Sequence, residues 1–282
     1  MTGLVLEGGA IRTIYSSGVC DGFLEQGWMA DYVVGVSAGI AYGVSYVSRQ
    51  QGRNLEILEK YVNDKRYMGK RNLLRRHNRS YFGLDFVYDE IPNHLIPFDF
   101  ETFGAFPGRV EAGVTNLETG EADYYPVRMD DRRFVLLRAS CAMPLLFPVY
   151  HINKKPYLDG GVADGVPFRR ALAQGCDKLV VVLSRERSYY RSPEKAEKLI
   201  CRRYQEYPHF CRAVASRAER YNRDHAQLLE LEAEGKAMIF APKSTRGFSR
   251  TEKNVDKIRA LWQEGYEEAL RRKEELRRFL GR

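Results

Sequence analysis

Residues 32–39 read Tyr-Val-Val-Gly-Val-Ser-Ala-Gly, and this stretch decides the fold. Its apolar first half predicts a buried strand, and residues 40–49 favour a helix. Between them, residues 35–39 have the form Gly-x-Ser-x-Gly. A strand, a sharp turn that carries a serine and a following helix are the context of a nucleophile elbow. The alternative interpretation is an ordinary tight turn, because glycine and serine are common in turns.

The elbow interpretation gives the residues of this turn a physical reason. Ser37 must sit on a tight, strained turn so that its oxygen projects above the sheet edge. Side chains at Gly35 and Gly39 would collide with the neighbouring strand and helix, so these positions favour glycine. The dipole of the following helix favours negative charge that develops near the serine. Ser37 is therefore the candidate nucleophile.

A second segment, residues 4–12, runs from a short apolar strand into the small-residue loop Gly8-Gly9-Ala10. A helix is predicted after it, over residues 17–26. Small residues let backbone N–H groups point into a pocket, so the loop can hold an oxyanion or a phosphate. A plain strand-to-helix turn is the alternative. The dinucleotide fingerprint and the phosphate-loop ending are both missing.

A third segment, Tyr157-Leu158-Asp159-Gly160-Gly161, predicts a strand that ends at the aspartate. Asp-Gly-Gly alone is most often only a turn. In the company of a candidate nucleophile, the aspartate becomes a candidate base for the serine.

Together the three segments resemble the patatin-like phospholipase family, in its bacterial form. That family carries a glycine-rich oxyanion loop, then Gly-x-Ser-x-Gly, and Asp-Gly-Gly or Asp-Gly-Ala far downstream. Residues 139–144, Ala-Ser-Cys-Ala-Met-Pro, are also similar to the small-residue helix end that precedes the aspartate in that family. The resemblance covers residues 3–185.

The resemblance implies a three-layer α/β/α sandwich with a mostly parallel central sheet. It implies a lipid acyl hydrolase with a Ser37–Asp159 dyad, without histidine, metal or other cofactor. The oxyanion hole would come from the loop Gly8-Gly9-Ala10. The supporting residues would be Arg12, Gly35, Gly39, Gly160 and Gly161.

Two residues of the loop depart from the family's pattern. Ala10 replaces a third glycine and Thr13 replaces the last one. Alanine keeps its N–H, so the oxyanion hole is expected to survive, at some cost in backbone freedom. The sequence context of Arg12 leaves two roles open, which are holding the loop and attracting an anionic headgroup.

Three other functions remain open. A lipid transacylase would use the same dyad, with a lipid alcohol in place of water. A Ser-His-Asp α/β-hydrolase could recruit His209 or His225, although several strands precede the elbow in that fold and only one precedes Ser37 here. The non-enzymatic alternative is a basic protein that binds a membrane or a nucleic acid.

The chain has 282 residues, a net charge of +8 and five cysteines. Cysteines without metal-ligand spacing favour a reducing compartment. No signal-peptide pattern and no run of about 18 apolar residues is found. We therefore expect a cytoplasmic protein without a transmembrane helix, with peripheral membrane contact as a further possibility.

Basic residues concentrate at residues 65–79 and in the last helix. One interpretation of the first run is a solvated face. The other is an interfacial element, because Tyr67, Met68, Leu73 and Leu74 interleave with charge suited to anionic lipid headgroups. No recognition motif supports nucleic-acid binding. The expected partners are therefore a lipid or other ester substrate and an anionic membrane, and no nucleic acid.

Alternating helix and strand patterns predict a largely parallel sheet covered by helices. The resemblance implies a patatin-like catalytic domain at residues 1–185, and the charged stretches beyond it predict a mainly helical C-terminal region at 186–282, packed on the core. The other predicted elements are an amphipathic stretch at residues 55–62, hairpins at 110–127 and 149–159, a buried strand at 178–184, helices at 193–234 and 251–280, and a strand at 237–241.

Overall fold

A computed structural model describes residues 1–74, 77, 79–128 and 130–281. Its centre is a sheet of eight strands in the order β5-β6-β3-β2-β1-β7-β8, with β4 also paired to β3. The strands are β1 (Thr2–Leu6), β2 (Tyr32–Val36), β3 (Arg109–Asn116), β4 (Ala122–Pro126), β5 (Tyr150–Ile152), β6 (Lys155–Asp159), β7 (Lys178–Val182) and β8 (Ala237–Phe240). Strands β3, β2, β1, β7 and β8 are parallel, whereas β4, β5 and β6 pair antiparallel. The prediction of a mostly parallel sheet is confirmed.

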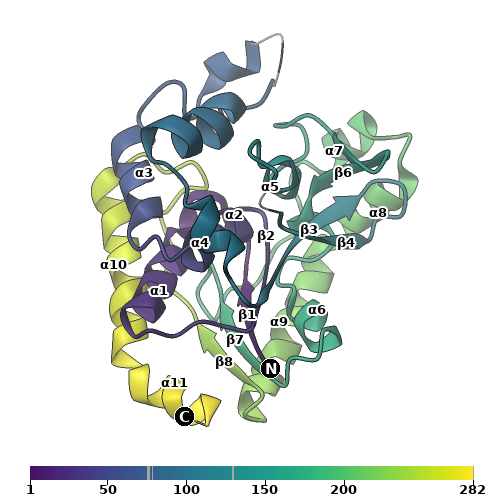
Figure 1. Cartoon of the computed structure of the whole chain (residues 1–282). Coiled ribbons are helices and arrows are strands. Elements are labelled where there is room, and N and C mark those ends of the chain that lie inside the picture. Colours follow the sequence, from purple (N-terminus) through teal and green to yellow (C-terminus); the bar gives the residue numbers. More distant parts are fainter. Residues whose placement is uncertain (75–76, 78, 129, 282) are drawn as a thin grey trace.

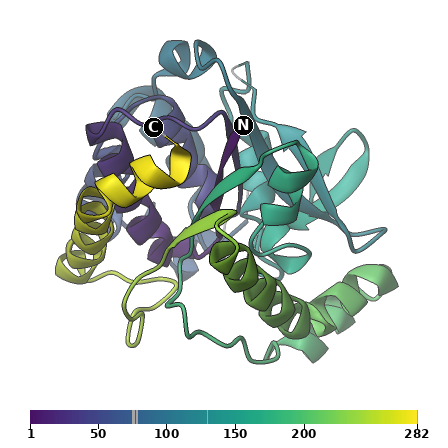
Figure 2. The ribbon, with the colours of Figure 1, turned by 90° about the horizontal axis from the view of Figure 1, so that it is seen from below.

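Helices cover both faces of this sheet, because side chains of each strand alternate between two cores. On β1, Leu4 and Leu6 belong to one core and Val5 belongs to the other. The first core includes side chains of α1 (Ile14–Glu25), α2 (Ala38–Val47) and α10 (Val255–Arg271), and the second those of α6 (Phe168–Ala173) and α9 (Arg217–Ala233). Figures 1 and 2 show these helices on opposite sides of the strands, which is the predicted three-layer α/β/α arrangement.

The elements around the three motifs follow the prediction closely. A short 3₁₀ turn, η1 (Ala10–Thr13), leads into α1, which begins three residues earlier than expected. The hairpin of β5 and β6 turns at Asn153 and Lys154, both of which have positive φ. Two such residues match the twist of the flanking strands. The remaining helices of this half are α3 (Arg53–Tyr61), α4 (Phe100–Gly104) and α5 (Val135–Ser140).

The prediction of one long helix at residues 193–234 is wrong. The structure has three helices there, which are α7 (Glu197–Arg203), α8 (Pro208–Ala215) and α9. Pro208 lies in the first turn of α8, where its missing N–H does no harm, whereas inside a continuous helix it would remove a hydrogen bond. The stretch 251–280 likewise divides into α10 and α11 (Lys273–Leu280), and Asn254 caps α10 by accepting from the N–H of Lys257 at 3.1 Å.

The C-terminal elements are built into the body of the fold. Strand β8 pairs with β7, and α10 packs closely on α1 (Figure 1). The approach requires a glycine at 265, because a Cβ there would lie 2.2 Å from the carbonyl oxygen of Tyr15. The Tyr15 hydroxyl also donates to Glu268 at 2.6 Å. The boundary at residue 185 stays a prediction.

The basic segment 65–79 differs from the expected membrane-facing element. Tyr67 and Met68 are buried in the first core, so the expectation that they face a membrane is wrong. Leu74 is 83% exposed, and it ends the short turn η2 (Lys70–Leu74). Arg75 and Arg76, which belong to the predicted basic run, lie outside the described residues. Any docking role therefore rests on fewer apolar side chains than the sequence pattern indicated.

No element was predicted over residues 80–108. A π-helical segment, η3 (Phe86–Leu95), contains Pro92 and leads toward α4. It contributes Phe86 and Ile91 to the first core. Across the described part of the chain, no helix combines the length and apolar character that crossing a bilayer requires.

Candidate active site

The sheet topology explains how Ser37 and Asp159 meet. Strand β2 runs parallel to β3 and ends with Val36 opposite Gly113. Strand β6 runs antiparallel to β3 and ends with Asp159 opposite Val114. Because Gly113 and Val114 are consecutive, β2 and β6 end at the same level on either side of β3. Two motifs far apart in the sequence thus meet at one point of the sheet edge.

This close meeting depends on Gly160. A Cβ at that position would lie 2.2 Å from the carbonyl oxygen of Gly113. This distance is too short for any residue with a side chain. The next residue, Gly161, donates its N–H to Oδ1 of Asp159 at 2.8 Å. Gly160 therefore lets the chain turn close to β3, and Gly161 holds one oxygen of the carboxyl group.

The hydroxyl of Ser37 donates to Oδ2 of Asp159 at 2.7 Å. Ser37 has φ 53° and ψ −137°, a sparsely populated conformation for a residue with a side chain. The turn is crowded as the sequence predicts, since a Cβ at Gly39 would lie 2.5 Å from the carbonyl oxygen of Leu6 and one at Gly35 would lie 2.9 Å from the Ile40 nitrogen. Helix α2 begins directly after the serine.

Ser140 holds the serine turn in place, a role that the sequence did not suggest. Its hydroxyl accepts from the N–H of Ser37 at 2.9 Å and donates to the carbonyl of Gly113 at 2.7 Å. The residue lies at the end of α5, in the small-residue segment quoted above. The only sequence signal for it was its place in that segment.

The loop at residues 8–10 lies against the serine turn. A Cβ at Gly8 would lie 2.9 Å from Cβ of Ser37. Ala10 has φ 52°, in the left-handed region that favours glycine, so the departure from the family's pattern carries the expected strain. No described residue accepts a hydrogen bond from the N–H of Gly9 or of Ala10. Both donors are therefore available to another group.

Asp159 is only 4% exposed. Its burial raises the pKa of the carboxyl group, while the hydrogen bond from Ser37 and the charge of Arg217 act in the opposite direction. Arg217 comes from the start of α9 and donates to the carbonyl of Gly161 at 2.7 Å. It had no recognisable signal in the sequence, because it is one arginine among many in a charged helix.

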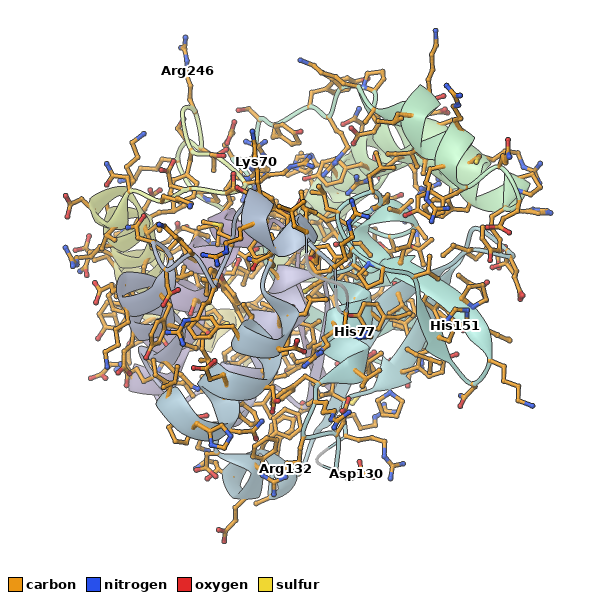
Figure 3. The ribbon with its side chains drawn as sticks, turned by 90° about the horizontal axis from the view of Figure 1, so that it is seen from above. Lys70, His77, Asp130, Arg132, His151 and Arg246 are labelled. Atoms are coloured by element: carbon orange, nitrogen blue, oxygen red, sulfur yellow. The ribbon has the colours of Figure 1, made fainter. Side chains whose placement is uncertain are left out.

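All five histidines belong to the described residues, and none of them contacts Ser37 or Asp159. His225 stacks on Tyr221, and burial lowers its pKa. His209 lies at the surface, where Nδ1 is 2.6 Å from Arg212. The other three, His77, His94 and His151, are exposed; Figure 3 shows His77 and His151 apart from each other.

Ser37 lies between two cavities of opposite character. One has mostly apolar walls, among them Val44, Ile57, Phe82, Val87, Phe134 and Leu137. The other contains Asp159 and the loop at residues 8–10, together with the arginines at 12, 191, 217 and 250. Among the described residues, no group of three or more His, Cys, Asp or Glu side chains is arranged to hold a metal ion.

Comparison with known proteins places these motifs in a family. Residues 4–172 match the family described as patatin-like phospholipase, and residues 207–281 match a domain of unknown function (DUF6363). A curated relative, "Uncharacterized protein YjjU" of Escherichia coli K12, is 26% identical over 208 residues, which are 68% of this chain and 54% of the relative. The chain thus spans about half the length of this relative.

Among solved structures, VipD from Legionella pneumophila aligns with 96% of this chain and 66% of its own chain, with 13% identity and a TM-score of 0.46. So weak a likeness carries no argument about function. The family match stands by itself, because it covers more than half of the chain and includes Ser37 and Asp159. The chain belongs to the patatin-like phospholipase family.

Proposed function

We propose that this protein hydrolyses carboxylic esters of lipids, with Ser37 as nucleophile and Asp159 as its base. The family suggests lipid hydrolase activity. The observation that carries the finer proposal is the 2.7 Å hydrogen bond from the Ser37 hydroxyl to a buried carboxyl group, at a cavity that also contains the loop at residues 8–10. A serine needs such an adjacent base to attack a carbonyl at neutral pH.

The chemistry follows from these atoms. Oγ of Ser37 attacks the ester carbonyl while its proton passes to Oδ2 of Asp159. The N–H groups of Gly9 and Ala10 donate to the oxyanion that forms. Collapse of this intermediate breaks the bond to the alcohol, which takes the proton from Asp159. Water then attacks the acyl-serine with Asp159 again as base, which releases the acid and restores the Ser37 hydroxyl.

The apolar cavity supports a lipid as the acyl donor. It begins at Ser37 and Ala38 and is lined by aromatic and aliphatic side chains. Each methylene group moved from water into such a site contributes about 0.8 kcal/mol. A fatty acyl chain would gain much of its binding free energy there, whereas a short polar acid would gain little.

Two substitutions at Ala10 test the oxyanion hole. Ala10→Pro removes the N–H and is expected to lower kcat for p-nitrophenyl butyrate by on the order of 10²–10³-fold. Ala10→Gly keeps the donor and relieves the positive φ, so it should change kcat only modestly. A folded Ala10→Pro protein with full activity would show that the loop is not the oxyanion hole.

The burial of Asp159 predicts how activity falls as the pH is lowered. Only the ionised carboxylate can accept the proton of Ser37, and burial raises its pKa. Activity should therefore fall, as the pH is lowered, at a higher pH than for an exposed aspartate. Arg217→Gln removes a charge that favours the ionised form, so the acid limb of kcat/KM should move to still higher pH. A limb that stays in place or moves to lower pH would contradict this role of Asp159.

A further inference from the structure

The second cavity at Ser37 collects positive charge from four separate parts of the chain. Arg12 comes from η1, Arg191 from the loop after β7, Arg217 from α9, and Arg250 from the loop before α10. Three of these arginines lie beyond the residues that match the patatin-like family. Two carboxyl groups, those of Asp159 and Glu194, also line the cavity. With both carboxyl groups ionised, the cavity keeps a surplus of two positive charges.

Arg12 is the residue whose environment most needs an anion. The residue is only 6% exposed, yet none of the described residues accepts a hydrogen bond from its guanidinium group. Burial, with the charges of Arg185 and Arg250 nearby, lowers the pKa of Arg12 to about 10. A buried cation without an acceptor is costly unless a ligand supplies one. The guanidinium group is suited to phosphate and carboxylate oxygens.

The other arginines leave further donors free around the same cavity. Arg191 packs over the ring of Tyr221 at 4.5 Å, and its buried Nε has no acceptor among the described residues. The side chain of Arg250 is exposed and donates to none of the described residues, while its carbonyl accepts from the N–H of Ile11 at 3.2 Å. That bond ties the 241–250 loop to the loop beside Ser37. Arg217 is held by Gly161 and lies 3.6 Å from Glu194.

The two cavities differ in polarity, so each suits a different half of a lipid ester. The apolar cavity suits the acyl chain, which leaves the arginine cavity for the alcohol that departs from Ser37. We propose that this arginine cavity binds a phosphate monoester on the alcohol half of the substrate, as in phosphatidate. A phosphate monoester carries close to two negative charges at neutral pH, which match the surplus charge of the cavity. The inference rests on the proposed function.

The same charges disfavour the common zwitterionic headgroups. A quaternary ammonium group is usually recognised by aromatic faces. In this cavity it would meet four arginines and only two carboxyl groups, so the net charge would repel it. A diacylglycerol would leave the guanidinium groups without an acceptor. The cavity therefore predicts a preference for phosphatidate over both phosphatidylcholine and diacylglycerol with the same acyl chains.

The test compares these three lipids, with dioctanoyl chains, in identical neutral mixed micelles. Wild-type kcat/KM for phosphatidate should exceed that for the other two by at least about tenfold, the size expected for charge-assisted hydrogen bonds. Soluble p-nitrophenyl butyrate reports on the proposed hydrolysis without a headgroup. If it is hydrolysed but phosphatidate is not preferred, the headgroup assignment is wrong and the proposed function stands. If neither p-nitrophenyl butyrate nor any of the three lipids is hydrolysed, the proposed function itself fails.

Arg250→Gln is the informative variant, because an exposed side chain without described partners can be replaced without disturbing the core. It should lower the ratio of kcat/KM for phosphatidate to that for p-nitrophenyl butyrate by about tenfold. Arg246→Gln is the matched control. Arg246 lies in the same loop and is exposed, does not line the cavity, and points away from the molecule in Figure 3. An equal change in both variants would reduce the effect to general surface charge and overturn the assignment.

A competition experiment distinguishes a subsite for a lipid headgroup from a site for free phosphate. Inorganic phosphate and glycerol 3-phosphate are added to the p-nitrophenyl butyrate assay. Weak competition by both, together with preferred turnover of phosphatidate, supports a headgroup subsite. Tight binding of inorganic phosphate without any preference for phosphatidate would instead identify a site for the free ion, and would overturn the proposal.

Discussion

Ser37→Ala is expected to abolish hydrolysis of p-nitrophenyl butyrate, with a loss of kcat on the order of 10⁶-fold, as for loss of the serine in other serine hydrolases. The reason is that no other described hydroxyl group donates to the carboxyl group of Asp159. Labelling by a fluorophosphonate probe should disappear together with the activity. The fold should persist, because the substitution removes only a hydroxyl group and leaves the backbone of the turn unchanged.

Ser48→Ala serves as the matched control for this variant. Ser48 follows the same helix, but its hydroxyl bonds to Ser45 and Gln50 and does not line either cavity. Its activity and labelling should match those of the wild-type protein. Circular dichroism and thermal unfolding of both variants establish that they are folded. Full residual activity in a folded Ser37→Ala protein would remove the enzymatic account.

Asp159→Asn is expected to lower kcat by about 10²–10⁴-fold, the usual contribution of a general base. The amide has nearly the same shape, so the substitution tests proton transfer more than packing. Asp164→Asn is the matched control, since Asp164 is a nearby carboxylate that accepts from the Tyr124 hydroxyl at 2.5 Å and lines neither cavity. It should keep kcat within a few-fold of wild type.

The histidine variants complete this comparison. His209→Ala and His225→Ala should leave kcat nearly unchanged, because neither residue contacts Ser37 or Asp159. If either variant loses as much activity as Asp159→Asn, a Ser-His-Asp triad must replace the proposed dyad. Stability should be checked for His225→Ala, because this ring is buried against Tyr221.

The sequence predicted the sheet and the meeting of its motifs because both depend on local patterns. Apolar runs identified β1, β2 and β7, and glycines marked the turns at which Ser37 and Asp159 leave the sheet. The close approach at Gly160 shows why those glycines are needed. The parts that were missed depend on tertiary contacts. Tyr67 and Met68 look amphipathic with their basic neighbours, but the fold turns both into the core.

The arginine cavity could not be predicted for the same reason. Three of its arginines lie in stretches that are rich in charge, which are Arg191, Arg217 and Arg250. The sequence around each of them predicts only a solvent-exposed side chain. They meet only because α9 and the 241–250 loop both return to the carboxyl edge of the sheet. Ser140 was hidden in a similar way, since its two hydrogen bonds join residues far apart in the sequence.

The most direct test of the central claim is to locate the covalent intermediate. The wild-type protein is treated with a fluorophosphonate until activity is lost, and the modified residue is identified by peptide mass spectrometry. We predict one adduct for each inactivated molecule, on Ser37, and none on the Ser37→Ala protein. An adduct on another residue that tracks the loss of activity, or complete inactivation without any adduct on Ser37, would contradict the account.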